Sequence, residues 1–304
     1  MGLLAGGGAS LVRRALLVVN PAARRARRVR GAALAAFAGA GVACDEVVTT
    51  APGEGGAACA ERHGGYDAVF TLGGDGTAME VVGALAGTGR PVGVLAGGTG
   101  NLIARTLGIP LDVRRAVPAL VAGDVARVDL GRLSTGRHFA FAAGVGIDAR
   151  MIEGTPAALK RRLGVLAYAL TAARAVLRRE RFAVRVTVDG VTHEREAVAV
   201  MVANFGAVLN ELIWLGPGIR QDDGLLDLCV FSPRTHRDAA RILWRLLRKR
   251  FDAQDDCLLY RPGRHFRVET TPALPAQADG ELLGATPFEV VVEPGAATLL
   301  VPRS

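Results

Sequence analysis

The chain has 304 residues, half of them apolar, and a net charge of +8. That length allows one large or two ordinary domains with a substantial core. The four cysteines are scattered and form no Cys-x-x-Cys pair, which speaks against a zinc site or a disulfide framework and fits a reducing compartment. No run reaches the roughly 20 apolar residues of a spanning helix, and the first residues make a poor signal peptide. We therefore expect a cytoplasmic protein.

The basic charge alone does not identify a partner. Lys160 and Lys249 are the only lysines, so the arginine- and alanine-rich composition is also explained by codon bias. Nucleic-acid binding is disfavoured, because the basic residues are dispersed and aromatic residues make up only 5% of the chain. An anionic membrane surface or an acidic ligand stays compatible with the charge.

The first 126 residues alternate between strand and helix patterns. Continuous apolar strands alternating with helices indicate a parallel, Rossmann-like sheet covered on both faces, and hence an α/β domain over 1–126. The expected strands are 15–19, 45–50, 68–72 and 91–95, and the expected helices are 22–40, 53–63, 77–82 and 102–107.

A glycine-rich turn follows the third of these strands, at Gly73, Gly74, Asp75, Gly76 and Thr77. Glycines let the backbone turn tightly and approach a ligand closely. A helix that begins there points its free N–H groups into the turn, which suits phosphate. Asp75 adds a central carboxylate, although an Asx bond that closes the turn would also explain it.

Thr77 and Glu80 have the spacing of a capping box. A second glycine-rich turn follows the fourth strand and contains Gly98, Thr99 and Asn101. Thr99 and Asn101 suit phosphate or ribose oxygens, or else cap the helix that follows. Both turns should lie at the carboxyl edge of the parallel sheet, where ligands bind in such folds.

Strand patterns dominate from residue 127 onward and predict a β-rich, sandwich-like domain over 127–304, whose last segment could return to the first domain. An apolar stripe at 159–177 predicts a core-facing helix. A basic amphipathic helix at 236–250 either packs on its domain or lies on an anionic bilayer. The expected strands are 127–133, 139–143, 182–188, 196–203, 225–231, 266–270, 288–293 and 298–301.

With both turns placed, the chain resembles the bacterial diacylglycerol kinase-like lipid kinases, whose superfamily includes the NAD kinases and sphingosine kinases. Departures from the family pattern are the segment 22–25, Leu102 in place of an acid, and the glycine-rich segment 52–56. The matching segments are Asn20-Pro21, Thr49-Thr50, 73–80, 98–101, 144–149, 160–168, 222–227 and 279–281.

The resemblance implies ATP and Mg²⁺ as cofactors and a cleft between the two domains. It assigns catalysis to Glu281, which would take the proton of the substrate hydroxyl, and to Asp75, which would hold Mg²⁺ directly or through water. Asp223, with the backbone carbonyls of Arg220 and Leu225, would bind a structural Mg²⁺. The implied nucleotide contacts are Asn20, Thr50, Gly73, Gly74, Asp75, Gly76, Thr77, Glu80, Gly98, Thr99 and Asn101.

Plain turn or capping roles remain alternatives for Asn20, Glu80 and Asp223. The implied function is phosphoryl transfer to a lipid hydroxyl at an anionic membrane. An NAD kinase-like enzyme and a non-catalytic lipid-binding relative are the competing readings. The sequence leaves open the lipid (diacylglycerol, a sphingoid base, phosphatidylglycerol or a polyprenol) and whether the protein is a homodimer.

Overall fold

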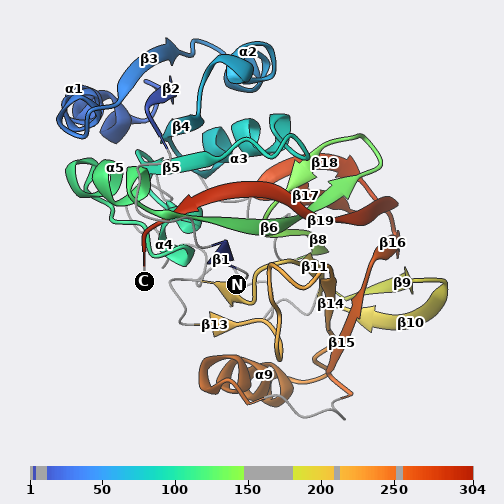
Figure 1. The fold of residues 1–304 in the computed structure, drawn as a ribbon. Coiled ribbons are helices and arrows are strands. Elements are labelled where there is room, and N and C mark those ends of the chain that lie inside the picture. The colour runs from blue at the N-terminus through green and yellow to red at the C-terminus, as the bar shows by residue number, and fades with distance from the viewer. Residues whose placement is uncertain (1–2, 5–11, 147–180, 209–212, 251–255, 304) are drawn as a thin grey trace. The chain divides into compact units, whose positions relative to one another are not determined.

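The computed structural model describes residues 3–4, 12–146, 181–208, 213–250 and 256–303. The helix expected at 159–177 and the motif residues 147–149 and 160–168 lie outside this part of the chain. The fold divides into two compact units (Figure 1). Unit 1 comprises Met1–Val128 and Gly295–Ser304, and unit 2 comprises Asp129–Pro294. The observed division thus follows residue 128, and the chain's last ten residues belong to unit 1.

Unit 1 is built on a parallel sheet, as the apolar runs of the sequence predicted. Its strands pair in the order β3-β2-β4-β5, and Leu299 near the end of β19 pairs with Val92 of β5 in parallel. All six residues of β4 are buried, as expected for a central parallel strand. The strands are β2 (Arg14–Val19), β3 (Ala43–Val48), β4 (Ala68–Gly73) and β5 (Val92–Ala96), with the short β1 (Leu3–Leu4) beside β6 (Asp124–Leu133).

The helices of unit 1 pack in pairs, α1 with α5 and α2 with α3. Phe37 of α1 meets Phe70 of β4 edge to face, 4.8 Å between ring centroids, and both rings are fully buried. Sequence reasoning did not predict α5, which contains Pro118. The helices are α1 (Arg24–Gly39), α2 (Glu54–Arg62), the short η1 (His63–Gly65), α3 (Asp75–Ala84), α4 (Leu102–Thr106) and α5 (Val113–Val121).

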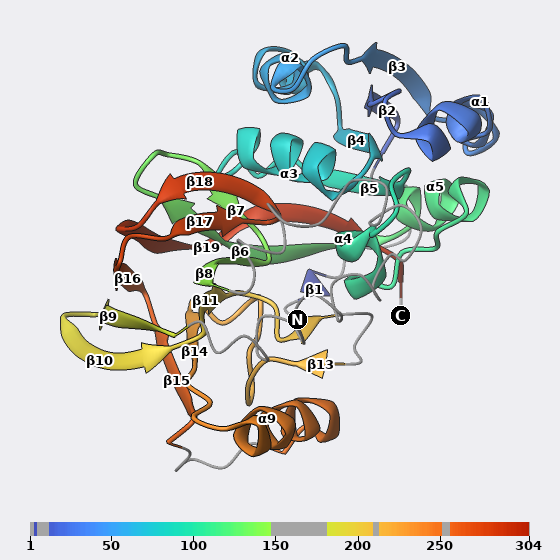
Figure 2. The ribbon, with the colours of Figure 1, turned by 180° about the vertical axis from the view of Figure 1, so that it is seen from behind.

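Unit 2 is β-rich, as expected, and contains two antiparallel sheets that share one core. One sheet has the order β10-β9-β16-β19, and the other has the order β15-β14-β11-β8-β17-β18. Phe266 and Val290 of the first sheet belong to the same buried cluster as Val200 and Leu228 of the second. Figure 2 shows β9 and β10 as a long hairpin of this unit.

Six strands of unit 2 were not predicted, namely β10, β12, β13, β15, β17 and β18, while β19 is one strand where the sequence predicted two. The strands are β7 (His138–Phe139), β8 (Ala142–Gly146), β9 (Phe182–Val188), β10 (Val191–Ala197), β11 (Ala199–Ala203), β12 (Ala207–Val208), β13 (Ile213–Trp214), β14 (Leu226–Phe231), β15 (Leu258–Gly263), β16 (His265–Thr271), β17 (Pro275–Ala278), β18 (Glu281–Ala285) and β19 (Phe288–Val301).

The basic helix of unit 2 forms where the sequence predicted it, as α9 (His236–Arg248). Thr235 and Asp238 make a reciprocal capping box at its start, and Lys249 ends it in the left-handed region. Across the described residues, no helix combines the length and the apolar character needed to cross a membrane.

Candidate functional site

The two glycine-rich turns of unit 1 lie backbone against backbone at the carboxyl edge of the sheet. The N–H of Gly97 donates to the carbonyl of Gly73 at 2.8 Å. A Cβ on Gly98 would stand 2.6 Å from the Cα of Gly74, so no side chain fits at that position. Glycine is therefore required here by the close approach of the second loop, and the resulting surface is lined by main-chain atoms.

Asp75 is the first residue of α3 and reaches toward the start of α4. Its Oδ1 accepts the N–H of Ile103 at 3.3 Å, and its Oδ2 would lie 2.9 Å from a Cβ on Gly100. Burial raises the pKa of Asp75 above the usual range, while nearby backbone N–H groups at the start of α4 act in the opposite direction. The carboxylate thus connects the N-terminal turns of two helices.

The capping box expected between Thr77 and Glu80 is wrong. The helix begins two residues earlier than predicted, and its N-cap, Gly74, makes no side-chain capping bond. Thr77 Oγ1 instead accepts a hydrogen bond from Asn20 Nδ2 at 3.0 Å. Glu80 Oε1 accepts the N–H of Gly56, at 2.9 Å, from the neighbouring helix α2.

The contacts of Gly55 and Gly56 explain why the segment 52–56, which departs from the family pattern, is rich in glycine. A Cβ on Gly55 would lie 3.1 Å from Glu80 Oε1, and one on Gly56 would lie 3.1 Å from the backbone carbonyl of Glu80. Helix α2 therefore approaches α3 closely enough for Glu80 to bond its backbone. In this structure Glu80 has a packing role between two helices.

Asn101 closes the second glycine-rich turn. It is buried and lies in the left-handed region at φ +50°. Its Oδ1 accepts the N–H of Gly98 at 2.9 Å, and its Nδ2 donates to the carbonyl of Gly98 at 3.0 Å. The side chain makes no capping bond to α4, so capping by the Asn101 side chain is excluded. Thr99 stands exposed at the tip of the same turn.

Asn20 and Thr50 follow two further strands at the same edge. Asn20 Oδ1 accepts the N–H of Ala22 at 3.0 Å, so this amide closes the turn after β2 and also holds Thr77. The exposed Thr50 hydroxyl donates to Glu54 at 2.8 Å. The structure thus places the predicted nucleotide-contact residues at one edge of one sheet, except Glu80, which lies farther along α3 and bonds α2.

In unit 2, the Asp-Gly-Glu triplet forms the turn between β17 and β18. The carboxylate of Asp279 accepts N–H bonds from Ala140, Phe141 and Ala142 at 2.7, 2.9 and 3.1 Å. Burial raises the pKa of Asp279 to about 6, against the lowering effect of those three N–H groups. Asp279 is therefore an anchor for the turn, a role that the sequence did not indicate.

Glu281 is exposed at the start of β18, two residues after that anchor. Its Oε2 forms an ion pair with the guanidinium of Arg137 at 2.6 Å. Nothing in the sequence pointed to Arg137, because it lies 144 positions away in the chain. The carboxylate of Glu281 is thus oriented by one cation while its surroundings remain open to solvent.

The segment around Asp223 has the oxygen chemistry that Mg²⁺ prefers. Asp223 Oδ1 accepts the N–H of Leu225 at 3.1 Å, and the guanidinium of Arg220 pairs with Asp222. Burial, and after it the charge of Asp223, raises the pKa of Asp227 to about 6. Because no group of three or more metal-binding side chains occurs in the described residues, a cation here would need backbone carbonyls and water as further ligands.

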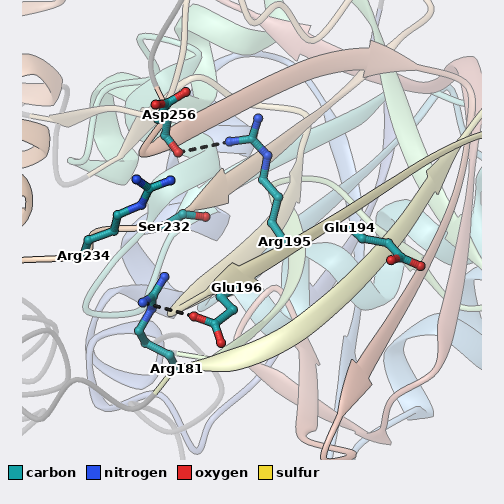
Figure 3. Close-up of a pocket in the computed structure, with 7 residues that line it drawn as sticks. All are labelled: Arg181, Glu194, Arg195, Glu196, Ser232, Arg234 and Asp256. Carbon is teal, nitrogen blue, oxygen red and sulfur yellow. Dashed lines mark hydrogen bonds and ion pairs between the residues drawn. The ribbon is translucent and has the colours of Figure 1, made fainter.

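A cavity of about 400 Å³ in unit 2 lies away from all of these residues (Figure 3). Its charged groups are largely matched, since Arg181 pairs with Glu196 at 3.1 Å and Arg195 donates to the backbone carbonyl of Asp256 at 3.1 Å. The carboxylate of Glu194 points away from Arg195 in Figure 3 and is paired with Arg185. The cavity therefore offers no glycine-lined cradle for a nucleotide.

Two protein-family models match the chain, one in each half. The model for the diacylglycerol kinase catalytic domain matches residues 14–133. The model described as "YegS C-terminal NAD kinase beta sandwich-like domain" matches residues 142–301, more than half of the chain. The protein therefore belongs to the diacylglycerol kinase-like lipid kinase family.

Individual relatives agree with this assignment. A diacylglycerol kinase of Bacillus subtilis (strain 168) is 29% identical over 92% of this chain and 93% of its own length. An uncharacterized Synechocystis protein is 31% identical over 77% of this chain, which spans only 54% of that relative. A solved Bacillus anthracis structure described as a "putative diacylglycerol kinase" is 26% identical, with a TM-score of 0.81 over 98% of both chains.

Proposed function

We propose that the protein is an ATP- and Mg²⁺-dependent lipid kinase that transfers the γ-phosphoryl group to the hydroxyl of diacylglycerol or a related lipid. The observation that carries this proposal is the pair of glycine turns in backbone contact, with the Asp75 carboxylate between the first turns of α3 and α4. Such a preformed main-chain surface is what phosphate oxygens require.

The helix starts in unit 1 supply the donors for this role. The N-cap of α3, Gly74, makes no side-chain capping bond, so the first N–H groups of α3 are not all consumed internally, whereas Asp75 accepts the N–H of Ile103 at the start of α4. Gly73, Gly74 and Gly76 give an approaching phosphate clearance, and Gly98 does the same from the second turn. Thr99, exposed at the tip, is placed to contact a phosphate or ribose oxygen.

Asp75 is the residue that would hold Mg²⁺, directly or through water. When bound, Mg²⁺ neutralises the charge that develops on the transferred phosphoryl group. Asn20, Thr77 and Asn101 fix the loops around Asp75 through their own hydrogen bonds. Asp223, with the carbonyls of Arg220 and Leu225, would hold a second, structural cation in unit 2.

Glu281 is the proposed general base in unit 2. It would accept the proton of the lipid hydroxyl as the hydroxyl oxygen attacks phosphorus. Its exposure leaves it accessible to a substrate, and Arg137 fixes its orientation. Asp279 supports Glu281 by anchoring the turn from which β18 begins.

A radiolabelled-ATP transfer assay tests the proposal. Purified full-length protein is incubated with Mg-ATP and either diacylglycerol-containing vesicles or NAD. We expect label in phosphatidic acid, no label in the nucleotide arm, and loss of transfer in EDTA and in Asp75→Ala. Asp124→Ala, which removes a carboxylate elsewhere in unit 1, is the matched control and should retain activity.

The other outcomes decide between the competing readings. Label in NADP alone would show a soluble-nucleotide kinase. No label with any lipid, together with vesicle binding unchanged in Glu281→Gln, would show a non-catalytic lipid-binding relative. Full transfer by Asp75→Ala would contradict the proposed role of the carboxylate.

A further inference from the structure

The surface of α9 combines apolar and basic side chains on the side that faces solvent. Ile242 and Leu246 are 7% and 8% exposed and pack against Cys257 and Leu258. Trp244 and Leu247, which come from the other side of the helix, are 49% and 40% exposed. A large indole turned away from the core of its own unit has no packing explanation within the described residues.

The charge around this apolar pair is almost entirely positive. Residues 234–250 contain seven basic side chains and a single carboxylate, Asp238, which is used by the capping box and by Arg241. Arg248 lies 5.2 Å from the centroid of the Trp244 ring, and Arg250 lies 5.9 Å from it. Arg237 forms no ion pair with any residue that the structure describes.

The second tryptophan of the chain belongs to the same region. The ammonium of Lys249 lies 4.1 Å from the ring centroid of Trp214 in β13, which packs beside α9 (Figure 1). Each of the two tryptophans therefore has a cation from the end of α9 against its ring, Arg248 at Trp244 and Lys249 at Trp214. Tryptophan rings with adjacent cations suit the interface of an anionic bilayer, where the ring meets the acyl boundary and the cation meets the headgroups.

A second basic helix shows that charge alone does not make this surface. Helix α1 carries five arginines and α9 carries four, but the apolar side chains of α1, such as Phe37, are turned inward. None of the large apolar residues that are exposed in the described structure lies on α1. Among the helices that the structure describes, only α9 presents both an exposed aromatic and an exposed aliphatic side chain among its cations.

We propose that α9 is the membrane-docking element of this protein and that Trp244, Leu247 and the arginines beside them bind an anionic bilayer. The helix would lie in the plane of the interface, with Ile242 and Leu246 still packed on unit 2. The proposal rests on the proposed function for its purpose, since a lipid substrate has to be reached in a membrane. Its test does not depend on catalysis.

Vesicle co-sedimentation without ATP is that test, with the full chain and vesicles of phosphatidylglycerol and phosphatidylcholine or of phosphatidylcholine alone. We expect binding to the anionic vesicles that weakens with salt. Trp244→Ala/Leu247→Ala and Arg237→Glu/Arg248→Glu should each reduce partitioning about tenfold or more. The matched controls, Val191→Ala for the apolar change and Arg27→Glu/Arg28→Glu on α1 for the charge change, should bind like the parent.

Tryptophan fluorescence supplies a readout that a general loss of charge would not move. In a Trp214→Phe background, anionic vesicles should shift the emission of Trp244 to the blue, and phosphatidylcholine vesicles should not. Transfer to a detergent-dispersed, short-chain diacylglycerol should be unaffected by the α9 variants. That arm separates failure of docking from failure of the kinase itself.

Three results would overturn the proposal. The first is undiminished binding of anionic vesicles by both α9 variants. The second is an equal loss in the α1 charge control, which would make the attraction nonspecific. The third is a change of sedimentation coefficient in Trp244→Ala/Leu247→Ala with unchanged vesicle binding, which would assign the surface to contact with a second copy of the chain.

Discussion

Asp75 in unit 1 and Asp279 in unit 2 both accept backbone N–H groups at a turn, yet they do so to different degrees. Asp279 receives three bonds of 2.7–3.1 Å, whereas the bond that Asp75 accepts from Ile103 is 3.3 Å long and other N–H groups near it belong to the same helix start. A carboxylate with three short bonds to one backbone segment anchors that segment. A carboxylate whose bond is longer keeps more capacity for another ligand. The contrast separates an anchor from a candidate metal ligand.

Replacing Glu281, the proposed general base, tests whether the two acids of the Asp-Gly-Glu triplet also divide into an anchor and a reactive group. Glu281→Gln should lower the transfer rate by about 10²–10⁴-fold, because an amide cannot accept the hydroxyl proton. The melting temperature should hardly change, since Glu281 is exposed and surface ion pairs contribute little. Transfer kinetics and thermal unfolding are measured on the same preparations. A comparable loss in Glu289→Gln, at an exposed ion pair of the same unit, would contradict this assignment.

Removing the charge of Asp75 should affect activity and stability in opposite directions. Asp75→Asn should slow transfer by about 10²–10³-fold, as expected for loss of one electrostatic contact to the transferred group. The pKa of Asp75 is raised in the folded protein. Protonation of this carboxyl therefore stabilises the fold below its ordinary pKa, and that stabilisation is lost as the pH rises through the pKa of the folded state.

Asp75→Asn should therefore be at least as stable as the parent at pH 7. The difference in unfolding free energy between the two proteins should shrink as the pH is lowered. Denaturant titrations at pH 4 and pH 7 measure this. Asp112→Asn, at the N-cap of α5 in the same unit, provides the control in which activity is retained. A marked loss of stability in Asp75→Asn at pH 7 would make Asp75 an anchor like Asp279.

Asp279→Ala should behave in the reverse manner. The variant leaves three backbone N–H groups without their acceptor, so its free energy of unfolding should fall by about 2–4 kcal/mol. Activity measured well below the midpoint of unfolding should fall less than in Glu281→Gln. Urea titration followed by circular dichroism checks the first point, and transfer assays at low temperature check the second. Equal stability of parent and variant would remove the anchor role.

The contact between the two glycine turns can be tested by a single methyl group. Gly98→Ala places a Cβ 2.6 Å from a backbone atom that cannot give way, so we expect a loss of about 1–3 kcal/mol and weakened ATP binding. Gly31→Ala, in helix α1 with open space around it, should instead gain up to about 1 kcal/mol. Calorimetric ATP titration and thermal unfolding compare the two. Unaltered ATP binding in Gly98→Ala would show that the turns need not touch.

The sequence predicted the parts of the fold that local pattern controls. Buried strands such as β4 are continuous apolar runs, and the glycine turns follow them directly. Strands β17 and β18 were missed because they contain few β-branched residues and owe their pairing to β8 and to the Asp279 anchor. Strand β19 was divided in two because Pro294 and Gly295 resemble a break, although the strand continues through them.

The sequence predicted which of the candidate residues lie at strand ends, but not how their side chains are bonded. The positions of Asn20, Asp75 and Asn101 follow from strand ends, which sequence reveals. The bonds that hold them are long-range, as between Asn20 and Thr77, and no local spacing reports such a partner. The spacing of Thr77 and Glu80 suggested a local bond between them. Both side chains instead form hydrogen bonds with residues that are distant in the sequence, Thr77 with Asn20 and Glu80 with Gly56.

The two adjacent glycines of α2 have a consequence for how this family can vary. Gly55 and Gly56 let Glu80 of α3 bond the backbone of α2, and either glycine would bring a Cβ to about 3.1 Å or closer to a neighbouring atom if replaced. The close spacing of α2 and α3 therefore depends on the absence of a Cβ at Gly55 and at Gly56. We therefore expect a relative with larger residues at these positions to place its α2 slightly farther from α3. The segment that departs from the family pattern in sequence thus serves the contact between α2 and α3.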